Sequence, residues 1–344
     1  MRMKAIVGLR YGPPEQLQLQ EIERPVPGDD EVLIEVVAAT INKADYILIC
    51  GKPFLVRMMG GGLFRPKSRT PGSDMAGRVV MAGKDVTGFK AGDEVFGNLS
   101  GSGRGAYAEY ARAREDGLVR KPANVTFQEA AAIPIAGLTA LQALRDHGKV
   151  APGKKVLING ASGGVGTFAV QIAKSFGADV TAVCSTANLD LMRRIGADHV
   201  IDYSKEDFTQ NGQTYDLIIG ANGYHPLWRY KRSLSAGGTY VMSGGKGGQL
   251  FQALFLGRLM SLTGDKRLTA VSARMNREDL AFMADLVSER KVVPFIEKTY
   301  PLNDAPQAIC YLGDGHVKGK LIISVKELGY NNDAQKTGRI IGKG

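Results

Sequence analysis

A run of small residues at positions 160–166, with the sequence GASGGVG, carries the clearest chemical signal in the chain. The apolar residues 156–158 precede it, and residues 167–176 have the composition of a helix. A turn of small residues between a strand and a helix lets the backbone approach a pyrophosphate, whose oxygens accept hydrogen bonds from the first N–H groups of the helix. The alternative is a structural turn that binds nothing. We predict a dinucleotide site whose contacts are Gly160, Ser162, Gly163, Gly164, Val165 and Gly166.

The residues after the second expected strand, 180–183, bear on which dinucleotide would bind. An NAD site usually has an acidic residue there, hydrogen-bonded to the ribose 2′-hydroxyl. Residues 185–188 instead read STAN, an uncharged segment that tolerates a 2′-phosphate but contains no Arg or Lys to clamp it. We therefore predict NADP(H), with NAD(H) as the alternative. Ser185 and Asn188 are expected contacts, and Tyr203 is expected to lie against the adenosine.

Apolar or β-branched segments in the second part of the chain alternate with expected helices. These segments are 156–158, 180–183, 199–201, 217–219, 239–242 and 268–272. The alternation predicts an open, doubly wound parallel sheet of the α/β class, in which ligands bind beside the carboxyl ends of the strands. Residues after the fourth and fifth strands are therefore further candidates for coenzyme contact: Asn222, Ser243, Gly244 and Gly245.

The first third of the chain is rich in strand-forming residues. The strand-like segments there are 32–37, 77–83 and 88–97. Short strands separated by glycine turns favour an antiparallel, barrel-like domain. Helices are expected over 129–132, 138–147 and 277–290. Thr126 and Glu129 have the spacing of a capping box, Asn276 is the expected cap of the last of these helices, and residues 320–325 form the last expected strand.

The composition is that of a folded chain with room for two domains. The chain has 344 residues and is 44% hydrophobic, which excludes a disordered protein. Its 3 Cys are isolated in sequence, so we expect no disulfide framework. The start of the chain lacks the apolar core of a signal peptide, and we expect a soluble, cytoplasmic protein. The most apolar stretch, 250–262, is interrupted by Arg258, so no membrane span is expected.

The charge balance is basic, because 44 Lys and Arg outnumber 34 Asp and Glu and give a net charge of +10. These charges are scattered along the chain, and no nucleic-acid-binding motif accompanies them. A solvated basic surface is the simplest interpretation. Binding to nucleic acid or membrane is not expected, whereas an anionic small molecule such as a dinucleotide suits this charge.

Short strings along nearly the whole chain follow the order and spacing of the medium-chain dehydrogenase/reductase superfamily. They are PGSDMAG at 71–77, AGDEVFG at 91–97, GAYAEY at 105–110, AAIP at 131–134, GLTA at 137–140, the glycine turn, and GADHVIDY at 196–203. The chain resembles the zinc-independent, quinone-oxidoreductase-like branch of that superfamily. The resemblance implies a GroES-like β-barrel catalytic domain, residues 1–126 and 275–344, with a Rossmann dinucleotide-binding domain, residues 127–274, inserted in it.

The departures from the zinc alcohol dehydrogenases of the superfamily bear on the reaction. Asn42 stands where those enzymes carry a catalytic Cys, and Ser73 and Asp74 stand where they carry His and Glu. The cysteines of their structural zinc lobe are missing as well. We therefore expect no zinc. Without a metal, an electron-poor acceptor is the easiest to reduce, and we expect hydride transfer from NADPH to a quinone or an α,β-unsaturated carbonyl compound.

The resemblance also places particular residues near the nicotinamide. Asn42 and Asp45 are catalytic candidates, although both could instead cap backbone turns and take no part in the chemistry. Tyr46 is a candidate hydrogen-bond donor to the developing oxyanion, with a role in the pocket wall as the alternative. The resemblance also implies that Thr139 contacts the coenzyme. Independently of the resemblance, Lys320 is an expected coenzyme contact because it follows Gly319, and the alternative is that it solvates the last strand.

Two apolar segments and two other functions complete the expectations. Residues 54–64 are expected as a mobile lip over the substrate or as an ordinary packed loop, and 251–259 as a cleft wall or a subunit interface. The alternatives to the reductase are a zinc-free NAD(P)-dependent alcohol dehydrogenase and a coenzyme-loaded protein that binds nucleic acid or a partner. A homodimer is expected by analogy with the fold alone.

Overall fold

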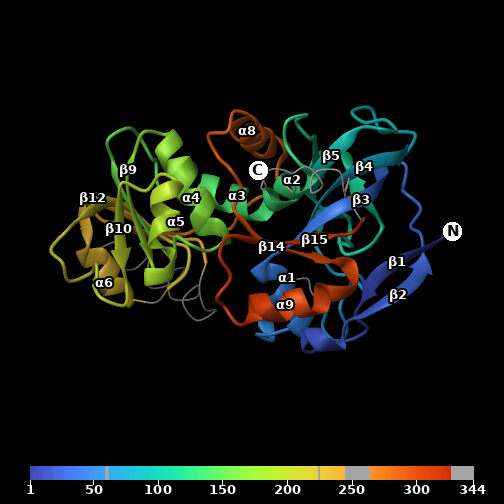
Figure 1. The fold of residues 1–344 in the computed structure, drawn as a ribbon, viewed down its shortest axis with the longest axis horizontal. Helices are drawn as coiled ribbons and strands as arrows, with labels where there is room; N and C mark the ends of the chain where they lie inside the picture. Colours follow the sequence, from blue (N-terminus) through green and yellow to red (C-terminus); the bar gives the residue numbers. More distant parts are fainter. Residues whose placement is uncertain (59–61, 224, 245–263, 327–344) are drawn as a thin grey trace, which may run out of the picture.

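The computed structural model describes residues 1–58, 62–223, 225–244 and 264–326. Figure 1 shows two lobes side by side along the long axis of the molecule. The green and yellow middle of the chain forms one lobe. The blue N-terminal third and the orange-red segment near the other end of the chain together form the second lobe. Parts of the chain far apart in sequence therefore share one domain.

A six-stranded parallel sheet, in the order β10-β9-β8-β11-β12-β13, forms the centre of the first lobe. Its strands are β8 (Lys155–Asn159), β9 (Asp179–Cys184), β10 (His199–Asp202), β11 (Tyr215–Gly220), β12 (Leu234–Met242) and β13 (Arg267–Ala270). Residues 156–158 are fully buried, as expected of strands covered on both faces. The strand order reverses between β8 and β11, so their carboxyl ends flank the crevice in which such sheets bind ligands. The predicted parallel sheet is confirmed.

A seven-stranded mixed sheet forms the second lobe, in the order β14-β15-β3-β4-β5-β7, with β6 also paired to β3. Its strands are β3 (Glu31–Ile41), β4 (Asp74–Ala82), β5 (Glu94–Asn98), β6 (Tyr110–Arg114), β7 (Leu118–Arg120), β14 (Ile296–Pro301) and β15 (Lys320–Ser324). A separate antiparallel pair consists of β1 (Arg2–Val7) and β2 (Gln18–Glu23). Leu321 on β15 lies opposite Ile41 on β3, which brings the residues around 320 beside those around 42.

Helices cover both sheets. They are α1 (Lys43–Cys50), α2 (Phe127–Ala132), α3 (Pro134–Gln142), α4 (Gly164–Ser175), α5 (Leu189–Arg194), α6 (Leu227–Arg232), α8 (Arg277–Ser288) and α9 (Ala305–Gly313). Single-turn 3₁₀ helices occur at Pro14–Gln16, Ser100–Ser102, Glu115–Gly117, Thr186–Asn188 and Leu302–Asp304, and a π-helical turn at Ala143–His147. Thr126 and Glu129 form the expected capping box, and Asn276 caps α8. Within the described ranges, no helix is long and apolar enough to cross a bilayer.

Some element limits differ from the sequence expectations. Helix α4 begins at Gly164 rather than at residue 167, so part of the glycine turn forms its first helical turn. Helix α3 begins at Pro134, because proline needs no N–H acceptor in a first turn. The helices α1 and α9 and the strands β1, β2, β6, β7 and β14 were not predicted. Residues 251–259 lie outside the described residues, and the domain boundaries near 126 and 275 remain a proposal.

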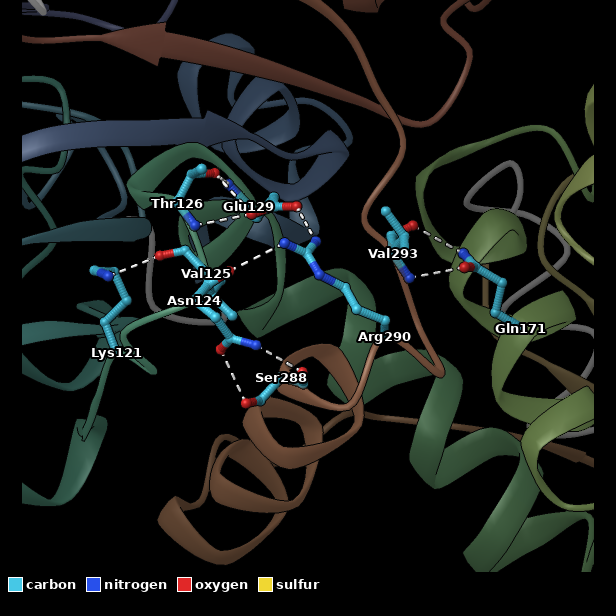
Figure 2. Close-up of polar contacts among 9 residues, drawn as sticks. All are labelled: Lys121, Asn124, Val125, Thr126, Glu129, Gln171, Ser288, Arg290 and Val293. Carbon is cyan, nitrogen blue, oxygen red and sulfur yellow. Dashed lines mark hydrogen bonds and ion pairs between the residues drawn. The ribbon is translucent and has the colours of Figure 1, made fainter.

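The end of α8 is fastened to the start of α2 by the polar contacts in Figure 2. Arg290 donates to the Glu129 carboxylate at 2.7 Å and to the Asn124 carbonyl oxygen at 3.0 Å. Asn124 and Ser288 exchange two further hydrogen bonds, of 2.8 and 3.0 Å. These contacts join residues about 160 positions apart and fix the path of the chain as it leaves α8.

A contact with Gln171 then holds the chain after α8 against helix α4, which packs on the parallel sheet. The Gln171 side chain on α4 accepts the Val293 N–H at 2.8 Å and donates to the Val293 carbonyl oxygen at 3.0 Å, as Figure 2 shows. Two residues later, the Phe295 carbonyl oxygen accepts the N–H of Lys320 at 2.8 Å. The backbone at the start of β15 is therefore positioned by α4, the helix that begins with the glycine turn.

Candidate active site

The first helix after β3 brings two of the predicted catalytic residues together. Asn42 is the N-cap of α1, and its N–H donates to the Asp45 carboxylate at 3.0 Å. The other Asp45 oxygen accepts the Ser73 hydroxyl at 2.7 Å, and the Tyr107 hydroxyl also lies 3.3 Å from the Asp45 carboxylate. Both Asp45 oxygens are thus occupied by groups that hold the helix start in place. The geometry gives Asp45 the capping role that was the alternative to catalysis.

Asp74 joins the other polar groups of this cluster. It is completely buried at the start of β4, and one of its oxygens accepts the Asn98 amide at 2.6 Å. The other oxygen accepts the Asn42 amide at 2.9 Å and the Ile135 N–H at 3.0 Å. Asp74 therefore connects β4, β5, α1 and α3. Sequence reasoning named Asp74 only as a departure from a zinc-ligand position, because nothing local in the sequence shows that these elements converge.

Lys320 links the cluster to the glycine turn. Its side chain is 3% exposed, and its Nζ donates to the Asn42 side-chain oxygen at 2.5 Å. A Cβ placed on Gly164 would lie 3.1 Å from the Lys320 Cδ, so the aliphatic stem passes directly beside the start of α4. The preceding Gly319 donates its N–H to the Ser162 carbonyl oxygen at 2.8 Å. The suggestion that Lys320 solvates the last strand is wrong, because the ammonium is buried inside the protein.

Burial sets the electrostatics of the cluster. Loss of hydration raises the pKa of Asp74 to about 6, although the Lys320 ammonium partly opposes that rise. Burial likewise raises the pKa of Asp45 above its usual value and lowers the pKa of Lys320 below its usual value. The Lys320 ammonium therefore stabilises the charged forms of Asp45 and Asp74, and the two carboxylates stabilise the charged form of Lys320. Such perturbed groups are common at functional sites, although buried ion networks also occur for structural reasons.

The glycine turn has the shape that a pyrophosphate needs. Gly163 caps α4, and the first N–H groups of a helix have no acceptor within the helix. A Cβ on Gly163 would meet only the Gly160 carbonyl oxygen, at 3.7 Å, so the space in front of the turn is open. A Cβ on Gly166 would lie 2.3 Å from that same oxygen, which only glycine permits. The turn therefore fits the phosphates of a dinucleotide, and Ser162 and Val165 belong to it as predicted.

The segment after β9 adds an unpartnered polar atom. Asn188 is buried and donates to the Ser185 hydroxyl at 3.1 Å, but its side-chain oxygen has no hydrogen-bond partner among the described residues. A bound ribose or base offers donors for such an atom. Tyr203 is 63% exposed, and its N–H donates to the Cys184 carbonyl oxygen at 3.1 Å at the end of β9. These positions suit the adenosine end of a coenzyme.

One acidic residue beside this segment was missed. Asp202 ends β10, the neighbour of β9, and accepts the hydroxyl groups of Thr186 and Ser204. These hydrogen bonds lower the pKa of Asp202, which keeps it ionised. The parallel register of β9 and β10 could have indicated it, because the ends of adjacent parallel strands meet at one edge. An acid therefore lies next to the STAN segment, although none lies within it.

The remaining predicted contacts are distributed along the same edge and beyond it. Asn222 packs against Gly160, whose added Cβ would lie 2.6 Å from it. Ser243 and Gly244 both donate their N–H groups to the Gly220 carbonyl oxygen, at 2.9 and 3.2 Å. Gly245 lies outside the described residues.

Two predicted residues face other groups. The Thr139 hydroxyl is turned to its own helix and donates to the Ile135 carbonyl oxygen at 2.6 Å. Tyr46 packs against Gly313 of α9, and the Lys43 ammonium lies 4.5 Å from its ring centroid. The Tyr46 N–H donates to the Asn42 carbonyl oxygen at 3.2 Å, but within the described ranges no hydrogen bond joins the Tyr46 side chain to Asn42, Asp74 or Lys320. The structure thus brings together Asn42, Asp45 and Lys320 but places the Tyr46 side chain apart from them.

The donor groups around Asn42 do not fit a catalytic zinc ion. Zinc in enzymes is bound by converging thiolate, imidazole or carboxylate groups in a tetrahedral arrangement. Here the Asp74 and Asp45 oxygens already accept hydrogen bonds from other side chains. The Lys320 ammonium lies against Asn42, and its positive charge would repel a zinc ion. In the part of the chain that the structure describes, no three His, Cys, Asp or Glu side chains are grouped as a metal site.

Comparisons with known proteins agree with this architecture. Residues 28–123 match the family model of the alcohol dehydrogenase GroES-like domain, and residues 195–323 match that of the zinc-binding dehydrogenases. A chloroplastic quinone oxidoreductase of Triphysaria versicolor is 36% identical over 316 residues, which cover 88% of this chain and 92% of that protein. A trans-enoyl reductase of Aspergillus terreus is 34% identical, covering 87% of this chain and 88% of that protein.

A solved structure shows the same fold. The quinone oxidoreductase of Coxiella burnetii superimposes with a TM-score of 0.85 at 31% identity, covering 95% of this chain and all of that chain. The expected GroES-like and Rossmann domains are thereby confirmed, and the family implies a nicotinamide coenzyme that the glycine turn fits. This chain belongs to the medium-chain dehydrogenase/reductase superfamily, in its quinone-oxidoreductase-like branch, and is an NAD(P)H-dependent oxidoreductase.

Proposed function

We propose that this chain reduces quinones or α,β-unsaturated carbonyl compounds with NADPH and without zinc. The observation that carries the proposal is the buried Lys320–Asn42–Asp74 network. The resemblance in sequence implies that Asn42 and Asp74 stand where zinc alcohol dehydrogenases of the superfamily carry Cys and Glu. The names of the relatives, a quinone oxidoreductase and a trans-enoyl reductase, support the same class of acceptor.

The chain's own residues bind and orient the reactants. Bound NADPH supplies the hydride. The N–H groups at the start of α4 bind its pyrophosphate, and the Lys320 stem holds that helix start against the catalytic domain. Asn42 is fixed in one orientation because its amide donates to Asp74 while its oxygen accepts from Lys320. Such fixed positioning is the main contribution a protein makes to hydride transfer.

The described residues around Asn42 form no zinc-ligand group, which limits the acceptors that the site can serve. Removing hydride from an unactivated alcohol is helped by a strong Lewis acid, whereas a quinone or enone is already electron-poor. The groups gathered around Asn42 offer hydrogen bonds and one buried positive charge. They are therefore better suited to the reduction of an activated acceptor than to alcohol oxidation.

The preference for NADPH rests on the segment 185–188. It contains no acid that would repel a 2′-phosphate, and Asp202 is directed to Thr186 and Ser204. However, Arg193, the nearest cation along the chain, already pairs with Asp190 at 2.8 Å. NADH therefore remains the alternative coenzyme, and we propose a moderate preference rather than strict selection.

Steady-state assays on metal-depleted protein test this function. We expect NADPH oxidation with a quinone and with an enone, and slow or undetectable NADP⁺ reduction with a primary alcohol. Activity with alcohols alone, or activity that requires added zinc, would contradict the proposal. The matched variants Asn42→Ala and Asn303→Ala, one in the cluster and one on an exposed turn, should differ, with only the first losing reductase activity.

The location and assembly remain proposals as well. We propose a cytoplasmic homodimer, on the basis of sequence composition and fold analogy. Light scattering of the purified chain tests the dimer, and a single-chain mass would contradict it. Fractionation of cells that express the full chain tests the location, because the names of two related proteins place them in chloroplasts.

A further inference from the structure

Basic side chains surround a group of adjoining hollows in the lobe that contains the mixed sheet. One hollow, partly open to solvent, has a volume of about 40 Å³ and has room for only part of a ligand. The two hollows that share lining residues with it have volumes of about 310 and 760 Å³, which are in the size range of small-molecule sites. Arg10, Lys67, Arg69 and Arg104 all line the first hollow. Lys67 and Arg69 also line the two neighbouring hollows, so these two cations stand where the three spaces meet.

These four cations have little compensating charge, although the Arg104 guanidinium partly opposes the rise in the pKa of Asp45. None of them takes part in an ion pair within the described ranges, whereas Arg112 and Arg114 of the same lobe pair with Glu31 and Asp30. Positive charges gathered with little compensation repel one another. An anion placed among them would relieve that repulsion.

Arg104 provides a second, independent sign of a missing ligand. Its Nε is buried without a hydrogen-bond partner in the described part of the chain, which is costly for a charged group. Its backbone also has a φ of 67°, an uncommon conformation for arginine. A buried donor and a strained backbone at a lining residue are typical of a binding site rather than of a solvated surface.

Acidic groups at the hollows do not satisfy these cations. Asp45 lines the first hollow, but both of its oxygens already accept hydrogen bonds from Asn42, Ser73 and Tyr107. Glu23 lines only the second hollow and forms no ion pair among the described residues. The first hollow thus retains positive charge that no ion pair among the described residues neutralises.

The walls of the first and third hollows are largely apolar. Leu17, Leu48, Ile49, Pro66 and Pro71 line the first hollow. Leu9 and Phe64 line the third hollow and are 60% and 85% exposed, an unusual degree for large apolar side chains. A ligand that matched both the positive charges and the apolar walls would need an anionic group as well as an apolar body.

We infer that these hollows bind an amphiphilic anion, a small molecule with an apolar body and a carboxylate or phosphate group held by Lys67, Arg69 and Arg104. Arginine and lysine bind both anions through charge-assisted hydrogen bonds. The inference does not depend on the acceptor that the enzyme reduces, because binding is measured without coenzyme.

Calorimetric titration of the full chain with octyl phosphate and with octanoate tests the inference. We expect saturable binding of at least one of them, and about tenfold weaker binding of 1-octanol and of inorganic phosphate, which each lack one of the two features. The double variant Lys67→Gln/Arg69→Gln should weaken binding about tenfold or more. Both positions are exposed, so the fold should persist.

The matched control is Lys90→Gln/Lys298→Gln, which removes two exposed charges that line none of these hollows. It should bind like the unmodified chain. Equal weakening in both double variants would contradict a local site. Binding of inorganic phosphate as tight as that of octyl phosphate would contradict a role for the apolar walls. Binding to phosphatidylglycerol vesicles without binding of either free amphiphile would also overturn the inference, because it would indicate docking on a membrane surface.

Discussion

Replacement of Lys320 by methionine tests the buried network most selectively. Methionine keeps an unbranched stem that can pass beside Gly164, but it removes the ammonium that donates to Asn42. The Asn42 oxygen then loses its donor, and Asp74 loses the nearest compensating charge. The variant therefore changes the electrostatics of the cluster with little change in shape.

The expected loss of stability depends on pH because Asp74 titrates near neutrality. Burial raises the pKa of Asp74 in the folded chain to about 6, above its value in the unfolded chain, so the folded state keeps this proton to higher pH. Below pH 6 Asp74 is neutral and the lysine has little charge there to compensate. As the pH rises through 6, Asp74 ionises and the favourable effect of Lys320 on it appears.

The expected loss of stability differs between the ionised and the neutral forms of Asp74. At about pH 8, removing one partner of a buried charged network costs about 3 kcal/mol or more. At about pH 5, the main loss is the hydrogen bond to Asn42, about 1–2 kcal/mol. The destabilisation caused by Lys320→Met should therefore be larger at the higher pH by about 1–2 kcal/mol.

Urea and thermal unfolding of the unmodified chain and of Lys320→Met at both pH values measure this difference. Lys318→Met is the control, because Lys318 lies two residues away, is only partly buried and forms no ion pair in the described ranges. It should show no such pH dependence. Equal destabilisation by Lys320→Met at both pH values, or stabilisation at the higher pH, would refute the electrostatic reasoning.

Three further changes test other parts of the structure. Gly166→Val would place a Cβ 2.3 Å from the Gly160 carbonyl oxygen and so distort the glycine turn. The rise in Tm on adding NADPH should therefore disappear, and an undiminished rise would show that the turn does not bind the coenzyme. Gln171→Ala leaves the N–H and carbonyl of Val293 without their partner and should cost about 2 kcal/mol in unfolding experiments, whereas unchanged stability would mean that this joint is dispensable. Asp202→Asn removes a negative charge beside the 185–188 segment, so the ratio of NADPH to NADH affinity should rise, and an unaltered ratio in binding titrations would place the 2′-phosphate elsewhere.

The sequence alone predicted the elements whose signals are local. The alternating apolar strands gave the parallel sheet, and the capping residues Thr126 and Asn276 gave helix starts that the structure confirms. The glycine turn was predicted because its residue types, its preceding strand and its following helix are all adjacent in sequence. Only its limits were displaced, since glycine also forms the first turn of α4.

The cluster could not be predicted in the same way, because its members come from distant parts of the chain. Lys320 and Asn42 are separated by 278 positions and meet only because β15 pairs with β3. Asp202 lies beside the segment after β9 because β10 is the neighbour of β9 in the sheet, and no local pattern in the sequence predicts that strand order. The role of Tyr46 stays a prediction: it lies near Asn42 in sequence, and in the structure its ring packs against Gly313 of α9.

Transfer of deuterium from NADPH deuterated at the reactive C4 position to an enone, in protein shown to be free of metal, tests the central claim most directly. A reductase that works through the Lys320–Asn42–Asp74 network should place deuterium on the β-carbon of the product, at a rate that added zinc does not increase. Failure to incorporate deuterium, or a rate that appears only when zinc is restored, would contradict metal-free hydride transfer.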